Sequence, residues 1–389
     1  MHAIAMLQKS LHQALTAMHA ARVHVLLGAV SALLNGRRLV LMDLARSWPD
    51  EIRVRAPLKR LDRLLSNPHL DEERPLLYAA MAGLLVGTTP HPVIVVDWSA
   101  LDHRGCWQLL RAAIPIGGRT LTILESVHPT AELGSAKVER QLLSTLKAML
   151  PANCRPIIIT DAGFGTPWFR AVAQFGWDYI GRVRRRIGVE TTPGSWTSSS
   201  ILLAQARITP TRFDHIQLTR SSPWQCHLVL ARQRHQGRQL LTQHGQPQRN
   251  KRALTAQRRG HTPCLLATSL TLRPNKIVSL YRLRMQIEES FRDLKCERFG
   301  CAFHHSLTRK PERIAILLLL QALASFLVHL VATRLDERSA QITYGGIVGS
   351  RRHFSMHRIA WEAIRKNPFA VPLKPHINPH IHSSQTWVL

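Results

Sequence analysis

The stretch YRLRMQIEESFRDLK, residues 281–295, decides how the rest of the chain is interpreted. Its apolar residues Ile287, Phe291 and Leu294 recur at helical spacing and would face a core. The spacing therefore predicts a single amphipathic helix over the whole stretch, with its polar residues on the opposite side.

The polar side of this helix carries an acid flanked by an aromatic hydroxyl and two cations. Glu288 and Lys295 are seven positions apart, so they lie on nearly the same side of a helix. Arg284 precedes Glu288 by one turn, and Tyr281 precedes Arg284 by nearly one more. An exposed helix with salt bridges has the same composition, so the stretch alone leaves both interpretations open.

The charge of the whole chain points to a polyanionic partner. Its 389 residues include 52 Lys and Arg against 24 Asp and Glu, a net charge of +28. This excess is larger than solubility requires and favours nucleic acid, with a membrane surface as the second candidate. The six cysteines form no dense framework and no signal peptide is evident. We therefore expect a cytoplasmic protein of two or three domains.

Two apolar segments each end in an acidic residue. PVIVVDWS (92–99) contains Asp97, and RPIIITDAGFG (155–165) contains Asp161. A carboxylate at the end of a buried strand is costly without a partner or an ion. Further strands are predicted at 106–116, 119–127, 177–184 and 264–270, and helices at 135–150 and 166–176. Buried strands alternating with helices are typical of an α/β sheet flanked by helices.

Two strand-end aspartates and a helix glutamate suit phosphodiester chemistry. Three carboxylates can hold two divalent cations about 3.5–4 Å apart, which clamp the attacking and leaving oxygens. Mg²⁺ prefers oxygen ligands and keeps several waters, so the carboxylates of Asp97, Asp161 and Glu288 would suffice to bind the ions. Arg284 and Lys295 would then hold phosphates of the bound strand.

The N-terminal region, 1–90, has a helical pattern throughout. Short helices are predicted at 37–48 and 56–67, and the second exposes Lys59, Arg60 and Arg63. This pair predicts a DNA reader resembling a helix-turn-helix. An ordinary helical bundle with a solvated basic face is the alternative.

Two further regions are basic. Residues 187–262 are predicted to form a β-rich insertion, whose end (243–261) reads as a phosphate-gripping loop or a disordered linker. The tail, 336–389, would contact DNA or a second subunit. From residue 345 onward its cations are Arg351, Arg352, Arg358, Arg365, Lys366 and Lys374.

The apolar stretch 314–333 has the length of a membrane span. However, Gln321, Ser325 and His329 recur every four residues and place a polar stripe along one side. We therefore expect a long helix buried in a large domain, and no association with a membrane.

The spacing of the signature residues resembles the Y-R-E-K pattern of bacterial DDE transposases of the insertion-sequence-four family. The residues are Tyr281, Arg284, Glu288 and Lys295. The blocks VVDWS (95–99), TDAGFGTPWF (160–169) and MQIEESFRDLK (285–295) resemble the insertion-sequence-ten branch. The similarity runs from about residue 35 to 335.

The resemblance implies a ribonuclease-H-like catalytic domain, 91–186 and 263–335, interrupted by the insertion. It implies a metal-binding catalytic triad and a second set of residues that contact transposon-end phosphates. These sets are Asp97, Asp161 and Glu288, and Tyr281, Arg284 and Lys295.

The resemblance also implies an activity. Family members bind terminal inverted repeats as dimers, cut the donor double-stranded DNA through a hairpin, and join the freed 3′ ends to target DNA. Two Mg²⁺ ions per active site are expected, with Mn²⁺ as a substitute. A related nuclease, or an inactive relative that only binds DNA, is the alternative, and the intact triad favours the transposase.

Overall fold

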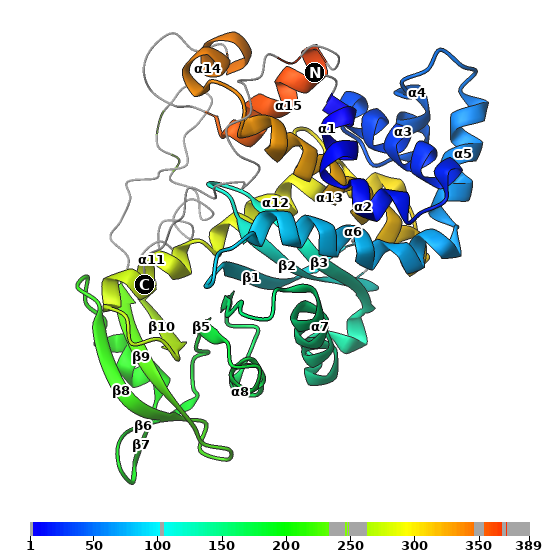
Figure 1. The fold of residues 1–389 in the computed structure, drawn as a ribbon. Coiled ribbons are helices and arrows are strands. Elements are labelled where there is room, and N and C mark those ends of the chain that lie inside the picture. Colours follow the sequence, from blue (N-terminus) through cyan, green and yellow to red (C-terminus); the bar gives the residue numbers. More distant parts are fainter. Residues whose placement is uncertain are drawn as a thin grey trace. The chain divides into compact units, whose positions relative to one another are not determined.

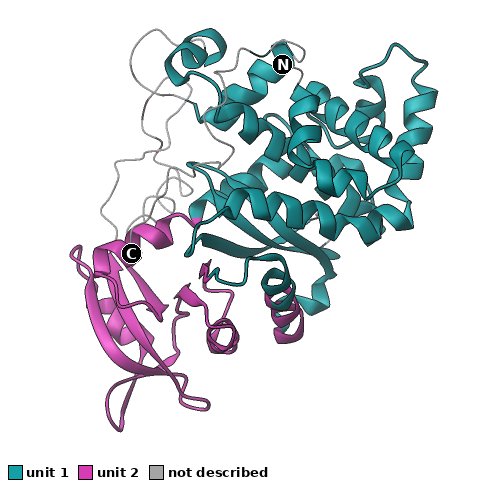
Figure 2. Ribbon diagram, in the orientation of Figure 1, with its two compact units in different colours: residues 1–135, 144–154, 285–388 teal, residues 136–143, 155–284, 389 magenta. Residues whose placement is uncertain are grey.

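The computed structural model describes residues 3–101, 105–232, 246, 248, 263–345, 354–367 and 371. The predicted loop at 243–261, apart from residues 246 and 248, lies outside this range, as do Arg351, Arg352 and Lys374. The chain divides into two compact units (Figure 2). Unit 1 comprises 1–135, 144–154 and 285–388, and unit 2 comprises 136–143, 155–284 and 389.

Unit 1 begins with helices that bury an apolar side. They are α1 Ala3–Ser10, α2 His12–Thr16, α3 Ala20–Gly36, α4 Leu41–Arg46, α5 Arg55–Leu65 and α6 Pro68–Val86. The helix predicted at 37–48 is shorter than expected, because Arg37 adopts a left-handed φ of 64° and ends α3. Helix α5 buries Leu61 and Leu64 and begins and ends within two residues of its prediction.

Three antiparallel strands of unit 1 lie in the order β3-β2-β1. They are β1 Val93–Ala100, β2 Trp107–Pro115 and β3 Thr120–Pro129. The predicted hairpin between β2 and β3 is confirmed: Gly117 and Gly118 have positive φ, a conformation that glycine adopts at little cost. A short 3-10 helix, Thr130–Glu132, follows β3.

Helix α13, Pro311–Ala332, forms the centre of unit 1. It contacts α1, α3, α5, α6, α15 and β3, and Figure 1 shows it among the N-terminal helices. By length and composition it alone among the described helices could cross a membrane, yet every residue from 314 to 331 is buried. The prediction of a buried core helix is confirmed. Helices α14 Glu337–Gly345 and α15 Met356–Lys366 and the 3-10 helix Phe303–Ser306 complete the unit.

The prediction of one helix over 281–295 is wrong. The chain forms α11 Pro274–Arg282 and α12 Met285–Lys295, separated by a turn. At the break the N–H groups of Leu283 and Arg284 donate to carbonyls three residues back rather than four, at 3.0 Å. This tighter spacing ends α11 without a glycine or a proline, so no residue type in the sequence indicates the break between the two helices.

Unit 2 holds a mixed sheet in the order β4-β5-β10-β9-β8-β6-β7. Strands β4 Ile157–Thr160 and β5 Asp178–Arg182 are parallel and joined by α8 Thr166–Gln174. Strand β10 Pro263–Thr268 is antiparallel to β5. The described part of 187–262 forms β6 Gly188–Thr192, β7 Ser195–Ser198, α9 Ser199–Ala204, β8 Thr211–Leu218 and β9 Trp224–Arg232. Helix α7, Ala136–Met149, has residues in both units. The chain is therefore a mixed α/β protein.

Candidate active site

The first predicted acid, Asp97, lies inside β1 and not at its end as predicted, because the strand continues to Ala100. It follows the four buried residues 93–96. Its side chain is 8% exposed, and Oδ1 accepts a hydrogen bond from the backbone N–H of Trp98 at 2.9 Å. In the ladder Asp97 is paired with Arg111 on β2, and Arg111 with Glu125 on β3. Directly opposed residues share one side of a sheet, so a negative, positive, negative row crosses the three strands.

Arg111 is buried and held by fixed partners. Its Nε donates to Glu125 at 2.8 Å, and the Tyr78 hydroxyl donates to the other Glu125 oxygen at 2.6 Å. Burial, with Glu125 beside it, raises the pKa of Tyr78. Arg111 and Glu125 were not predicted from the sequence, although each is a charged residue inside an apolar strand, which is a signal of a buried pair.

Lys295, at the end of α12, lies beside the Asp97 strand. Its Nζ donates to Ser99 Oγ at 2.7 Å, and it lies 5.7 Å from the centroid of the Phe291 ring. The pKa of Lys295 is lowered to about 8, chiefly by burial and also by the nearby Arg111, while Asp97 acts in the opposite direction. The structure thus brings the predicted phosphate contact next to one predicted metal ligand.

Glu288 lies in the first turn of α12 and is half-buried. The N-terminal end of a helix favours a negative side chain. The neighbouring Glu289 accepts a hydrogen bond from Arg292 at 2.8 Å and lies 4.0 Å from Arg119. Glu289 is therefore engaged in a salt bridge on its own helix.

In unit 2, Asp161 follows directly after β4. Its Oδ1 accepts the Gly163 N–H at 2.5 Å, and a Cβ at Gly163 would lie 2.8 Å from that oxygen. Arg184 donates to the carbonyls of Ala162 and Gly163. A glycine and an arginine thus fix the turn that carries the carboxylate.

Tyr281 and Arg284 belong to the same unit as Asp161. Arg284 Cζ lies 5.9 Å from the centroid of the Tyr281 ring. The Tyr281 hydroxyl is buried and has no hydrogen-bond partner among the residues that the structure describes. Burial raises the pKa of Tyr281, Arg284 lowers it, and Asp161 raises it. These three residues are therefore close enough to act on one another.

The remaining predicted contacts, Lys59, Arg60 and Arg63, are exposed on α5. Their side of the helix is opposite to the buried leucines. An exposed basic surface attracts phosphates without a fixed geometry.

The donor chemistry of the predicted triad suits a hard divalent cation, because all three side chains are carboxylates. Asp97 and Glu288 belong to unit 1 and Asp161 to unit 2. Within the described ranges, no group of three or more His, Cys, Asp or Glu side chains is close enough to hold a metal ion. The meeting of the three carboxylates stays a prediction.

Comparison with known families identifies the chain. The transposase DDE domain matches residues 88–327, which include Asp97, Asp161 and Glu288. A search of curated proteins found no match. The matched span is more than half of the 389 residues and contains all three predicted acids in order. The chain therefore belongs to the transposase DDE domain family.

Proposed function

We propose that this DDE transposase moves an insertion sequence by cut-and-paste transposition, as a member of the insertion-sequence-four family near its insertion-sequence-ten branch. One observation carries the proposal. Lys295 of the Y-R-E-K pattern donates to Ser99, 196 residues earlier, on the same strand as Asp97. A signature cation next to a candidate metal ligand supports the proposal, because phosphoryl transfer needs a positive group beside the reacting phosphate.

The catalytic roles follow from the side-chain chemistry. Asp97, Asp161 and Glu288 would hold two Mg²⁺ ions, or Mn²⁺ in their place, in a ribonuclease-H-like domain formed by 91–186 and 263–335. Such ions supply Lewis acidity and lower the pKa of a bound water. Lys295 would contact a phosphate oxygen as a point charge.

Arg284 and Tyr281 would hold the transposon-end backbone. The Arg284 guanidinium offers a planar fork of donors to a phosphate. The buried Tyr281 hydroxyl, without a hydrogen-bond partner among the described residues, would donate to the same strand. Both residues would fix the position of the scissile phosphate.

The reaction begins with water attacking the phosphorus at the end of the element, which frees a 3′-hydroxyl. That hydroxyl attacks the opposite strand, displaces the flanking DNA, and closes a hairpin. A second water opens the hairpin, and the regenerated 3′-hydroxyl attacks target DNA. In each step one P–O bond forms and another breaks.

The other parts of the chain would bind the substrate. Helices α4 and α5, within an N-terminal domain of residues 1–90, would read the terminal inverted repeats through Lys59, Arg60 and Arg63. The basic insertion 187–262 and the tail 336–389 would contact DNA or the second subunit of a dimer. Such a protein acts on the bacterial nucleoid in the cytoplasm.

The test compares two adjacent glutamates. Glu288→Gln is expected to bind inverted-repeat DNA normally and to lose Mg²⁺-dependent strand cleavage by at least about 1,000-fold, because a metal ligand is lost. Glu289→Gln is the control, since Glu289 is paired with Arg292. Cleavage by the Glu288→Gln protein at the wild-type rate would show that Glu288 is not a catalytic residue.

A further inference from the structure

Unit 1 contains a cavity of about 580 Å³ that none of the three predicted acids lines. Its wall is formed by Arg37, which directly follows α3, by residues of β3, α12, α13 and α15, and by residues that flank α12, β3 and α15. This volume lies in the range of small-molecule sites, roughly 300–1,000 Å³. The catalytic proposal gives the cavity no role.

One end of the cavity has more positive than negative charge. The Glu362 carboxylate accepts three guanidinium groups: Arg37 at 2.6 Å, Arg358 at 2.9 Å and Arg365 at 3.0 Å. One negative charge against three positive charges leaves an excess of two. Arg37 and Arg358 line the cavity, whereas Arg365 does not.

The Arg37 guanidinium is not fully satisfied by its protein contacts. Its Nε is buried and has no acceptor within the part of the chain that the structure describes. Burial lowers the pKa of Arg37, and the nearby Arg358 lowers it further. Like charges gathered in a half-buried place are costly, and a bound anion would remove that cost.

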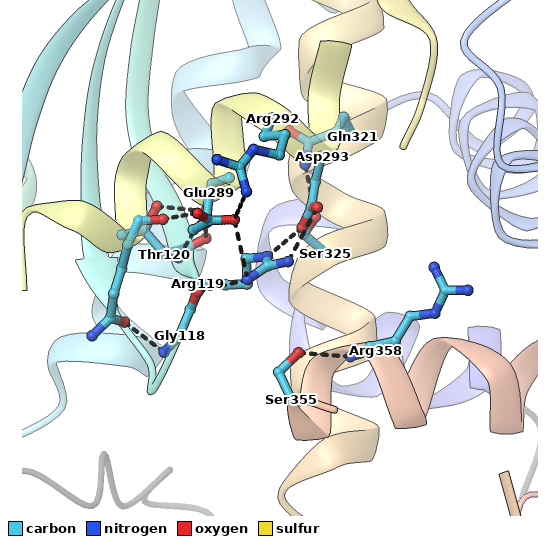
Figure 3. Close-up of polar contacts among 12 residues, drawn as sticks. Gly118, Arg119, Thr120, Glu289, Arg292, Asp293, Gln321, Ser325, Ser355 and Arg358 are labelled. Carbon is cyan, nitrogen blue, oxygen red and sulfur yellow. Dashed lines mark hydrogen bonds and ion pairs between the residues drawn. The ribbon is translucent and has the colours of Figure 1, made fainter. Parts of the chain in front are cut away.

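The third arginine that lines the cavity, Arg119, is already neutralised. Figure 3 shows the Arg119 guanidinium between two acids of α12, with Asp293 at 2.5 Å and Glu289 at 4.0 Å. There the Thr120 N–H donates to the Ser290 hydroxyl at 2.8 Å. An anion would therefore bind at the Arg37 and Arg358 end.

Aromatic side chains form much of the remaining wall. The Trp361 ring is fixed, because its Nε1 donates to the Leu34 carbonyl at 3.1 Å and Arg37 lies over it at 5.7 Å. Phe299 and Phe354 also line the cavity and are 59% and 46% exposed. Exposed aromatic rings beside cations favour a ligand that carries both a flat ring and a negative charge.

We propose that this cavity binds a nucleoside phosphate, with its phosphate at Arg37 and Arg358 and its base against Phe299, Phe354 and Trp361. A free nucleotide and the terminal nucleotide of a DNA strand share this chemistry. The site does not depend on the strand-cleaving role, because Asp97, Asp161 and Glu288 lie elsewhere.

Calorimetric titration of the full chain tests the proposal with dAMP, deoxyadenosine and inorganic phosphate. Deoxy-AMP is expected to bind more tightly than either part alone. Arg358→Gln should weaken dAMP binding about tenfold, the effect of one charge-assisted hydrogen bond. Arg365→Gln, the matched control, removes a partner of the same Glu362 outside the cavity and should change affinity less than about threefold.

Competition distinguishes the two sources of the ligand. A 5′-phosphorylated duplex with one unpaired terminal nucleotide displaces dAMP if the cavity takes a strand end. If the duplex binds without displacing dAMP, the cavity takes the free nucleotide. Both results support a nucleoside phosphate site.

Three results would overturn the proposal: no dAMP binding at millimolar concentration, phosphate binding as tightly as dAMP, or equal effects of Arg358→Gln and Arg365→Gln. If Arg358→Gln proves unstable in a thermal melt, Phe354→Ser replaces it, because Phe354 is half-exposed. That variant should reduce dAMP affinity towards that of phosphate, and unchanged dAMP affinity would count against the site.

Discussion

Helices α5 and α12 both belong to unit 1 and both carry basic residues, but these residues differ in how far they are buried. Helix α5 exposes Lys59, Arg60 and Arg63 to solvent. Helix α12 holds Lys295 against Ser99 and Phe291, where burial lowers its pKa to about 8. An exposed cation attracts any phosphate nearby, whereas a fixed, half-buried cation acts on one phosphate in one geometry. The difference predicts that α5 contributes affinity and α12 contributes rate.

The largest effect is expected from Lys295→Met. Strand cleavage should fall about 100-fold, as for loss of one positioned charge, while DNA affinity changes little. The lowered pKa means that the fold disfavours the charged lysine, so the variant should melt at a higher temperature than wild type at pH 7. Single-turnover cleavage and a thermal melt measure both quantities.

The control for Lys295→Met is on the same helix. Arg292→Gln removes an exposed cation three residues earlier and should leave cleavage within about threefold, as expected for a surface pair. Equal losses from both variants would mean that α12 acts through net charge, and the contrast with α5 would disappear.

A smaller effect is expected on α5. Replacing Lys59, Arg60 and Arg63 by Gln should weaken DNA binding about tenfold at moderate salt. The slope of log affinity against log salt should become shallower by about 3, because three phosphate contacts are lost. Cleavage of saturating DNA should stay near the wild-type rate.

The matched comparison for α5 is α7, which also exposes three cations. They are Lys137, Arg140 and Lys147. The same replacement there should change the salt slope by less than 1, since α7 is assigned no DNA contact. A slope change of equal size on both helices would favour a merely solvated basic surface on α5.

The smallest effect concerns His329, a buried basic group on α13. Burial, and then the nearby His357, lowers the pKa of His329 on α13 to about 3. The unfolded chain takes up this proton below pH about 6.5 and the folded chain does not, so stability falls as pH falls from 6.5 towards 3. His329→Leu should flatten this dependence by up to about 1.4 kcal/mol per pH unit. Urea unfolding at pH 7, 6 and 5 measures it, and identical slopes would contradict the assignment.

Local patterns in the sequence predict much of the fold. Alternation of apolar runs with glycine turns locates β1 to β5, and the composition of α13 together with its polar stripe predicts burial. The break between α11 and α12 is not predictable in this way, because it depends on backbone hydrogen bonds at Leu283 and Arg284, which are neither Gly nor Pro.

The same holds for the candidate site. Its residues can be predicted from their spacing and from the family resemblance, but the residues that contact them cannot. The Arg111–Glu125 pair and the contact between Lys295 and Ser99 join residues that are far apart in the sequence, so local sequence patterns do not predict them. Which residues share a compact unit is likewise set by the tertiary fold, which groups Tyr281 and Arg284 with Asp161.

The proposed active site requires Asp97, Asp161 and Glu288 to hold the same metal ions on DNA. Iron-directed cleavage tests it: Fe²⁺ replaces Mg²⁺ in the DNA-bound chain, and ascorbate with peroxide then cuts the polypeptide beside the bound iron. If the three carboxylates share the ions, the polypeptide should be cut beside residues 97, 161 and 288, and excess Mg²⁺ should suppress all three cuts. Cuts beside 97 and 288 with none beside 161, or cuts that Mg²⁺ does not suppress, would contradict it.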